Sequence, residues 1–188
     1  QICVAPVLVS SSSTGPSPKI DFLIEKLREL LDEGHSALVF SQFTSFLDIL
    51  EKDLARNRIR FRRLDGATRV SKRKKLVEGF QSGEGESVFL LSLKAGGQGL
   101  NLTRASYVFH LDPWWNPAVE NQASDRAHRI GQKKVVNVTR VVMRQTIEEK
   151  MMSLKEKKTK LYQAVMDGAV SGRKALSISK EDFDFLLN

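Results

Sequence analysis

Apolar and polar residues follow one another along the chain in a pattern that predicts helices and strands in alternation. Apolar residues recur at helical spacing from Ser17-Pro18 until Gly34, and short runs of Val, Leu and Phe then separate successive helices. The pattern predicts helices over 17–34, 43–54, 71–81, 117–130 and 146–166, and strands over 37–40, 59–64, 87–91, 107–111 and 135–142. This alternation indicates an α/β fold, with a parallel sheet covered by helices on both faces.

The composition changes at both ends of this pattern and suggests three regions. Residues 1–16 are interpreted as a linker segment, because they end in a run of Ser, Thr, Gly and Pro. Residues 17–145 form the predicted lobe. Residues 146–188 begin with a long helix and end in a polar tail, where a short helix is expected near 179–187. The chain begins with Gln1 rather than Met, which favours a fragment of a longer protein.

The composition also limits the class of protein. Of the 188 residues, 41% are hydrophobic, which is enough for a packed core and excludes a mainly disordered chain. No apolar run approaches the roughly 20 residues of a membrane-spanning helix, so no membrane partner is expected. The single cysteine, Cys3, excludes an intrachain disulfide and favours a reducing, intracellular compartment. One cysteine and three histidines argue against a zinc site.

The excess of positive charge is concentrated in one window of the chain. The formal net charge is +8, from 30 Lys and Arg against 22 Asp and Glu. Residues 54–75 carry ten basic residues and one acid, whereas the remaining 166 residues carry 20 basic and 21 acidic groups. The ten are Arg56, Arg58, Arg60, Arg62, Arg63, Arg69, Lys72, Arg73, Lys74 and Lys75. Such a patch indicates an anionic partner, with nucleic acid as the first candidate.

Polar residues follow several predicted strands, at the positions where parallel sheets bind ligands. Ser41 and Gln42 lie between a strand and a helix, where capping explains them as well as phosphate binding does. Asp65-Gly66 is a turn, and Thr68 either caps the basic helix that follows or contacts a phosphate. The residues alone leave these interpretations open.

The strand predicted at 87–91 leads into a glycine-rich stretch. Gly96, Gly97 and Gly99 allow backbone N–H groups to approach a phosphate or a sugar closely, and Lys94 is placed to contact a phosphate. A tight turn uses the same residues, so this stretch by itself favours a structural role over binding.

The helix predicted over 117–130 carries the most informative polar pattern. Gln122, Arg126 and Arg129 lie at i, i+4 and i+7, opposite an apolar stripe, and Asp125 is placed to orient Arg129. Two guanidinium groups that point together can bind a phosphate, because each is planar and permanently charged. The alternative is an ordinary amphipathic helix with a solvated face.

Taken in order, these four segments resemble the C-terminal RecA-like lobe of Swi/Snf-type ATPases, within the superfamily-two helicases. The most specific stretch is Gln122-Ala-Ser-Asp-Arg-Ala-His-Arg-Ile-Gly-Gln132, and the stretches 38–43, 64–68 and 92–103 match further motifs of that lobe. The resemblance covers roughly residues 17–170. It implies a RecA-like parallel sheet with helices on both faces, plus a C-terminal helical extension that packs on its own lobe or braces the missing one.

The resemblance also implies a role for each position. Arg126 and Arg129 resemble arginine fingers that reach an ATP held mainly by an N-terminal RecA-like lobe, and Gln122 resembles a nucleotide-cleft residue beside them. Gly97, Gly99 and Asp125 are expected near the nucleotide. Contacts to DNA are expected from Ser41, Gln42, Thr68, Lys94, Asn101 and Trp115, whereas Trp114 is expected to pack.

Two motifs of a complete motor are absent from the sequence. It contains neither the phosphate-binding loop Gly-x-x-x-x-Gly-Lys-Ser/Thr nor an acidic Asp-Glu-x-His strand end for Mg²⁺. ATP and Mg²⁺ are therefore expected to be held mainly by the missing N-terminal lobe, and the isolated chain is expected to be inactive. We predict the second motor lobe of an ATP-dependent double-stranded DNA translocase or remodeller, which is a DNA-dependent ATPase.

Two alternatives remain from the sequence, namely a catalytically incomplete nucleic-acid-binding module and a lobe of an RNA helicase. A DNA-bound protein is expected as a possible cargo, and its identity is not encoded in this lobe. The expected location is the cytoplasm or nucleoid of a prokaryote, or the nucleus of a eukaryote.

Overall fold

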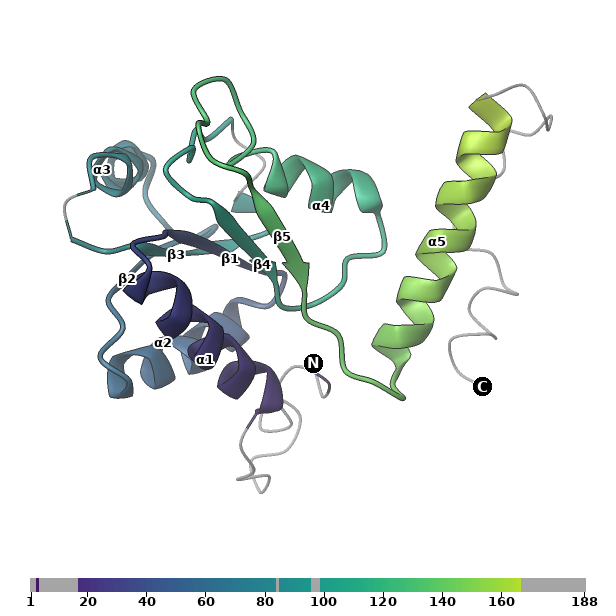
Figure 1. Ribbon diagram of the computed structural model, residues 1–188, viewed down its shortest axis with the longest axis horizontal. Coiled ribbons are helices and arrows are strands. Elements are labelled where there is room, and N and C mark those ends of the chain that lie inside the picture. The colour runs from purple at the N-terminus through teal and green to yellow at the C-terminus, as the bar shows by residue number, and fades with distance from the viewer. Residues whose placement is uncertain (1–2, 4–16, 84, 96–98, 167–188) are drawn as a thin grey trace.

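A five-stranded parallel sheet forms the centre of the molecule (Figure 1). The computed structural model describes residues 3, 17–83, 85–95 and 99–166. The strands are β1 (Ala37–Ser41), β2 (Phe61–Leu64), β3 (Val88–Ser92), β4 (Tyr107–His110) and β5 (Asn137–Arg140), in the spatial order β2-β3-β1-β4-β5. All four neighbouring pairs are parallel, which confirms the predicted α/β class.

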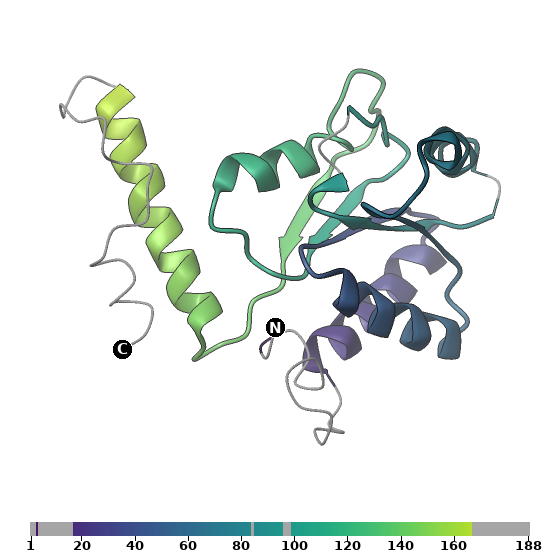
Figure 2. The same ribbon diagram turned by 180° about the vertical axis from the view of Figure 1, so that it is seen from behind.

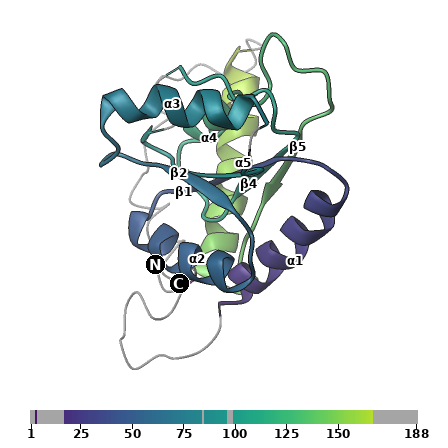
Figure 3. The ribbon, with the colours of Figure 1, turned by 90° about the vertical axis from the view of Figure 1, so that its left-hand side faces the viewer.

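Helices cover both faces of this sheet (Figure 3). Helices α1 (Pro18–Asp32) and α2 (Thr44–Arg56) lie on one face, and α3 (Val70–Gln81) and α4 (Pro117–Ser124) lie on the other. Successive residues of β1 point to opposite faces, so Val39 packs with α1 and α2 whereas Leu38 and Phe40 pack in the cluster of α3 and α4. Every residue of β1 and β3 is buried, as expected for strands covered on both faces.

The predicted helix over 117–130 is wrong in its second half, because α4 ends at Ser124. The N–H groups of Arg126 and Ala127 bond to the carbonyls three residues back, and the Arg126 carbonyl accepts from Leu102 N at 2.9 Å. Residues 125–130 therefore form turns held against another segment, and Gly131 adopts a φ of +102°.

Two predicted strands are also shorter than expected. Arg58 adopts a φ of +58° and Ile59 N bonds to Leu54 O, so residues 58–59 belong to the turn that ends α2. Strand β5 is an edge strand that pairs only with the four residues of β4, which limits it to Asn137–Arg140 rather than 135–142. The predicted linker segment, the tail and its short helix lie outside the described residues, apart from Cys3.

The last helix, α5 (Ile147–Met166), lies beside the lobe rather than on a face of the sheet (Figure 2). It is joined to the lobe by two buried ion pairs. Lys19 of α1, only 1% exposed, contacts Glu148 at 2.6 Å and also donates to the carbonyls of Leu111 and Val141. The first turns of α5 therefore contact their own lobe at the ends of β4 and β5.

The second ion pair joins α5 to α4. Glu120 is fully buried, and its carboxylate accepts from Trp114 N at 2.7 Å and from Arg140 Nε at 2.9 Å, and forms an ion pair with Lys155 Nζ at 2.7 Å. Burial alone would raise the pKa of Glu120, but these donors lower it below its usual value, so the carboxylate is ionised. No helix in the described residues is long and apolar enough to cross a membrane.

Candidate nucleotide and nucleic-acid interface

The loops that carry the predicted site residues meet at one edge of the sheet, because all strands run parallel and their carboxyl ends lie together. The segments after β3 and β4 flank the end of β1 on either side. Leu93 N donates to Ser41 O, and Leu111 N donates to Phe40 O, both at 3.0 Å. The loops after β1, β3 and β4 therefore begin as direct neighbours.

Ser41 points into the protein rather than towards solvent. Its side chain is fully buried, and its hydroxyl donates to the Asp112 carboxylate and accepts from Phe43 N at 3.1 Å. The same carboxylate accepts from Gln42 N at 2.9 Å, while the half-buried Gln42 side chain lies near Pro113 O. Ser41 and Asp112 thus fix the backbone that presents Gln42.

The Asp112 carboxylate is buried, which is unusual for an acidic side chain. Burial raises the pKa of Asp112 to about 6, although hydrogen bonds from Ser41 and Gln42 N act in the opposite direction. Sequence reasoning missed Asp112 as a site residue. The available signal was an acid placed directly after a buried strand, but its partner Ser41 lies 71 residues earlier.

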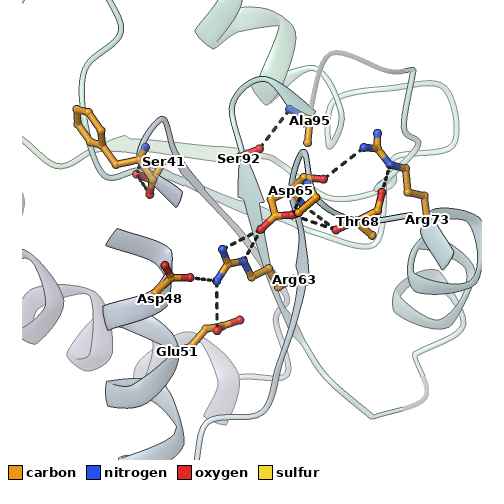
Figure 4. Close-up of polar contacts among 11 residues, drawn as sticks. Ser41, Asp48, Glu51, Arg63, Asp65, Thr68, Arg73, Ser92 and Ala95 are labelled. Carbon is orange, nitrogen blue, oxygen red and sulfur yellow. Dashed lines mark hydrogen bonds and ion pairs between the residues drawn. The ribbon is translucent and has the colours of Figure 1, made fainter. Parts of the chain in front are cut away.

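Thr68 lies in a compact turn after β2 (Figure 4). Its hydroxyl accepts from Asp65 N at 3.0 Å and lies 3.3 Å from the Asp65 carboxylate. Arg73 of α3 donates to the carbonyls of Thr68 and Asp65, at 3.0 and 3.3 Å. The turn is therefore held both by its own side chains and by the first turn of the basic helix.

Arg63 is the main charged partner of this turn. It contacts three carboxylates, Asp48 at 2.6 Å, Asp65 at 2.8 Å and Glu51 at 3.2 Å (Figure 4). Burial alone would raise the pKa of Asp65, but the hydrogen bonds and charge of Arg63 lower it. Arg63 is thus used within the fold, and neither its role nor that of Asp48 was predicted.

Other members of the basic window are paired in the same way. Arg62 contacts Glu86 at 2.8 Å and Arg56 contacts Asp53 at 2.9 Å. Exposed members without an ion pair in the described part of the chain are Arg58, Arg60, Arg69, Lys72 and Lys75. About half of the window is therefore available to an external anion.

The glycine-rich stretch begins at the end of β3. Ser92 Oγ accepts from Ala95 N at 3.3 Å, and Lys94 between them is exposed (Figure 4). Gly97 lies outside the described residues. On the far side of that gap, Gly99 has a φ of +64°, and Asn101 is exposed.

The structure brings the two predicted arginines against this stretch. Arg129 Nη1 donates to Gly99 O at 3.0 Å and to Leu100 O at 3.3 Å, and Leu102 N donates to Arg126 O. Gln122 and Asp125 are exposed on and just after α4. The single helical face expected for Gln122 and the arginines does not exist, because both arginines lie beyond the helix end.

Arg126 forms no ion pair among the described residues. Its side chain is 3% exposed, and its Nε has no hydrogen-bond partner among the described residues. Burial lowers the pKa of Arg126, as does the nearby positive charge of Arg129, while Asp125 acts in the opposite direction. Two neighbouring guanidinium groups that repel each other are suited to hold an anion between them.

The loop after β4 separates its two tryptophans. Trp115 is 46% exposed, whereas Trp114 packs against the cluster of α3 and α4, as predicted. Asn116 Oδ1 accepts from Ala118 N at 3.0 Å and caps α4. The cap fixes the direction in which the chain leaves Trp115.

His110, at the end of β4, is a structural histidine. It is buried, stacks on Phe40 and bonds through Nε2 to Ser124 Oγ at 2.9 Å. Burial lowers the pKa of His110 to about 4, so the ring is neutral at physiological pH. No group of three His, Cys, Asp or Glu side chains within the described residues is arranged to hold a metal ion.

Comparison with known proteins identifies the family of the chain. The helicase conserved C-terminal domain family matches residues 19–131, and the chain belongs to this family. Among its relatives, it is 43% identical over 170 residues to the DNA repair protein RAD5A of Arabidopsis thaliana, covering 90% of this chain and 16% of that protein. It is 42% identical over 183 residues to the ATP-dependent helicase rhp16 of Schizosaccharomyces pombe, covering 96% and 21%.

A solved structure supports the same assignment. The crystal structure of the C-terminal part of the Fun30 ATPase domain matches with a TM-score of 0.75 and 34% identity, over 98% of this chain and 58% of that one. The lobe is a helicase C-terminal domain of the SNF2-family ATPases. The chain spans only between 12% and 21% of the length of the curated relatives compared with it here.

Proposed function

We propose that this lobe is the second half of an ATP-dependent double-stranded DNA translocase or remodeller. The observation that carries the proposal is the position of Arg129 against Gly99 and Leu100, beside the buried Arg126, whose Nε has no hydrogen-bond partner among the described residues. In this role the two arginines act on ATP as fingers, and Gln122 and Asp125 border them. The rest of the nucleotide site belongs to an N-terminal RecA-like lobe of the same protein.

The residues present fit a nucleotide that is held elsewhere. The buried, unpartnered Nε of Arg126 and the repulsion between the two arginines suit an anion, but no acidic cluster for a cation is found in the described residues. Bound ATP and Mg²⁺ supply the phosphoryl group and neutralise part of its charge. The arginines of this lobe stabilise the negative charge that develops during phosphoryl transfer. Gly97 and Gly99 are assigned to the same side of the site.

The DNA grip is assigned to the loops at the carboxyl edge of the sheet. Lys94, Asn101 and Trp115 are exposed there, and Gln42 and Thr68 are half-buried. Ser41 takes part by holding the Gln42 backbone through Asp112, since its own hydroxyl is engaged. The exposed bases of the 54–75 window extend this surface. Phosphate contacts of this kind carry little sequence information, so binding is expected to be non-specific and sensitive to salt.

In the full-length protein, closing and opening of the two lobes on ATP would move these contacts along the DNA. A DNA-bound protein is the proposed cargo. The relative named as a DNA repair protein, together with plant and fungal sources, supports a nuclear location.

Arginine substitutions in the full-length protein test the finger assignment. Arg126→Ala or Arg129→Ala should each lower DNA-stimulated ATP turnover by about 10³-fold, with a smaller effect on ATP binding. Arg144→Ala, another exposed arginine, is the matched control and should leave turnover unchanged. A loss below tenfold for both finger variants would refute the assignment.

The alternatives predict different results in the same assay. An incomplete binding module would show no turnover in the full-length protein, and an RNA helicase would be stimulated more by RNA than by double-stranded DNA. The isolated lobe should bind DNA yet hydrolyse essentially no ATP, since one half of the site is missing. Measurable DNA-stimulated turnover by the pure lobe would contradict the proposal.

A further inference from the structure

The carboxylate of Glu120 joins three segments of the lobe at one point. It is fully buried in the first turn of α4, and its Oε2 accepts from Arg140 Nε of β5 at 2.9 Å. Its Oε1 accepts from Trp114 N at 2.7 Å and lies 2.7 Å from Lys155 Nζ of α5. One oxygen is therefore shared between the backbone of the loop after β4 and a side chain of the last helix.

The loop that Glu120 contacts carries Trp115. On one side of Trp115, Trp114 is fixed by its N–H bond to Glu120 and by packing in the cluster of α3 and α4. On the other side, Asn116 is fixed as the cap of α4. Trp115 itself is 46% exposed. The direction in which its indole points therefore depends on how firmly its two neighbours in the chain are held.

A carboxylate suits this position because three donors meet there. An ionised carboxylate has two oxygens that only accept, and here they face Trp114 N, Arg140 Nε and Lys155 Nζ. An amide would offer one oxygen and would turn its own N–H donors towards a cation. A buried carboxylate stays ionised only beside cations, so Glu120 holds the loop while Arg140 and Lys155 are in place.

Lys155 is the cation of this group that comes from outside the sheet and its covering helices. It is 8% exposed, although α5 lies beside the lobe rather than on a face of the sheet (Figure 1). The first turn of α5 is already attached through the pair of Glu148 and Lys19. A second buried ion pair adds little stability over apolar packing, because removing both charges from water costs free energy. Stability alone therefore does not explain why a lysine is buried against Glu120.

We propose that Glu120 and Lys155 are positioning residues for the contact of Trp115 with DNA. Both side chains are buried, so they act on DNA only through the loop. Glu120 holds the loop at Trp114 N, and Lys155 holds the Glu120 carboxylate ionised and in place. The seating of α5 on its own lobe thus sets how firmly Trp115 is presented. The proposal rests on the proposed function, since Trp115 is assigned to the DNA grip there.

A double-mutant cycle in the full-length protein tests this role. Lys155→Met removes the cation at a similar side-chain length, and Trp115→Ala removes the contact. Each alone should raise the DNA concentration for half-maximal ATPase stimulation by about three- to tenfold, the effect of losing one contact. The double variant should stay within about twofold of Trp115→Ala, because both changes act on the same contact. The KM for ATP at saturating DNA should not change.

Arg62→Met is the matched control. It also removes a partly buried cation from an ion pair, with Glu86 at 2.8 Å, but on β2 at the opposite edge of the sheet. Its effect on DNA stimulation should be small and should add to that of Trp115→Ala. Lys155→Arg, which keeps the charge, should stay close to the wild type. Glu120→Gln repeats the test from the other partner if Lys155→Met folds poorly, as thermal unfolding would show.

The possible outcomes separate this proposal from the proposed function. If the effects of Lys155→Met and Trp115→Ala multiply in the double variant, the positioning role is overturned. If Trp115→Ala weakens DNA stimulation and Lys155→Met does not, the DNA grip stands and the positioning role is again wrong. If Trp115→Ala has no effect, the assigned DNA contact of Trp115 is refuted, and the positioning role with it.

Discussion

The basic window 54–75 and the arginine segment 126–136 differ in what the fold does with their charge. In the basic window, Arg63 alone contacts three carboxylates, and Arg62 and Arg56 each contact one. In the arginine segment no cation forms an ion pair with a described acid, and Arg126 keeps a buried nitrogen without a partner. The basic window carries more charge than the arginine segment, but a smaller fraction of its cations lack an ion pair.

This difference bears on the roles proposed for the two regions. A cation whose partner carboxylates lie in the same lobe stabilises the lobe, whereas a buried cation without them makes the lobe less stable than it could be. A buried cation without partner carboxylates is typical of binding or catalytic sites, where activity comes at a cost in stability. Substitutions in the two regions test this difference.

The largest effect on stability is expected from Arg63→Met. The change leaves Asp65 nearly buried without its cation and should lower the free energy of unfolding by about 2 kcal/mol. The measurement is chemical denaturation of the isolated lobe. Arg63 lowers the folded-state pKa of Asp65, so its contribution is present above the unfolded pKa near 3.8 and is lost as the pH falls through the folded value. The gap between wild type and variant should therefore shrink below about pH 4, and a constant gap would contradict this account.

A smaller effect, on binding alone, is expected from the free bases of the window. Changing Arg69, Lys72 and Lys75 together to Gln should reduce the slope of log affinity against log salt by up to about 0.9 for each phosphate that is no longer bound. Folding stability should change little, because none of the three forms an ion pair among the described residues. Fluorescence anisotropy with a double-stranded oligonucleotide at several salt concentrations gives the slope. An unchanged slope would place the DNA elsewhere.

The smallest effect on stability is expected from Arg126→Met. The apolar side chain has a similar length and removes an unpaired buried charge, so the free energy of unfolding should stay within about 0.5 kcal/mol or rise. Turnover in the full-length protein should nevertheless fall as for Arg126→Ala. If Arg126→Met lowered the free energy of unfolding as much as Arg63→Met, the charges of both regions would stabilise the lobe in the same way.

Most of the fold could be predicted from the sequence because its signals are local. The buried strands were placed within one or two residues, as were α1, α2 and α3, since apolar period and turn residues lie within each element. The end of α4 could not be predicted, because the backbone bond from Leu102 to Arg126 comes from a segment 24 residues away. At this point the contact with Leu102 outweighs the helical pattern of apolar residues in the sequence.

The members of the candidate site were proposed from the sequence, but their partners within the fold could not be predicted from it. Sequence order identified Arg126, Arg129 and the loops at the strand ends. The inward orientation of Ser41 depends on Asp112, and the buried pairs Lys19–Glu148 and Glu120–Lys155 join residues that are distant in the chain. Charged side chains are usually exposed, so no local pattern singles out these buried ones.

The central position of β1 has a consequence for synthesis of the protein. Both neighbours of β1 in the sheet are made later, since Ala37 pairs with Val88 and with Tyr107, which are 51 and 70 residues further along. At about 5–20 residues per second, a ribosome needs several seconds to make the first of these partners. During that interval β1, whose residues are all buried in the finished fold, is exposed without either neighbouring strand. The nascent chain is therefore most prone to incorrect association at β1.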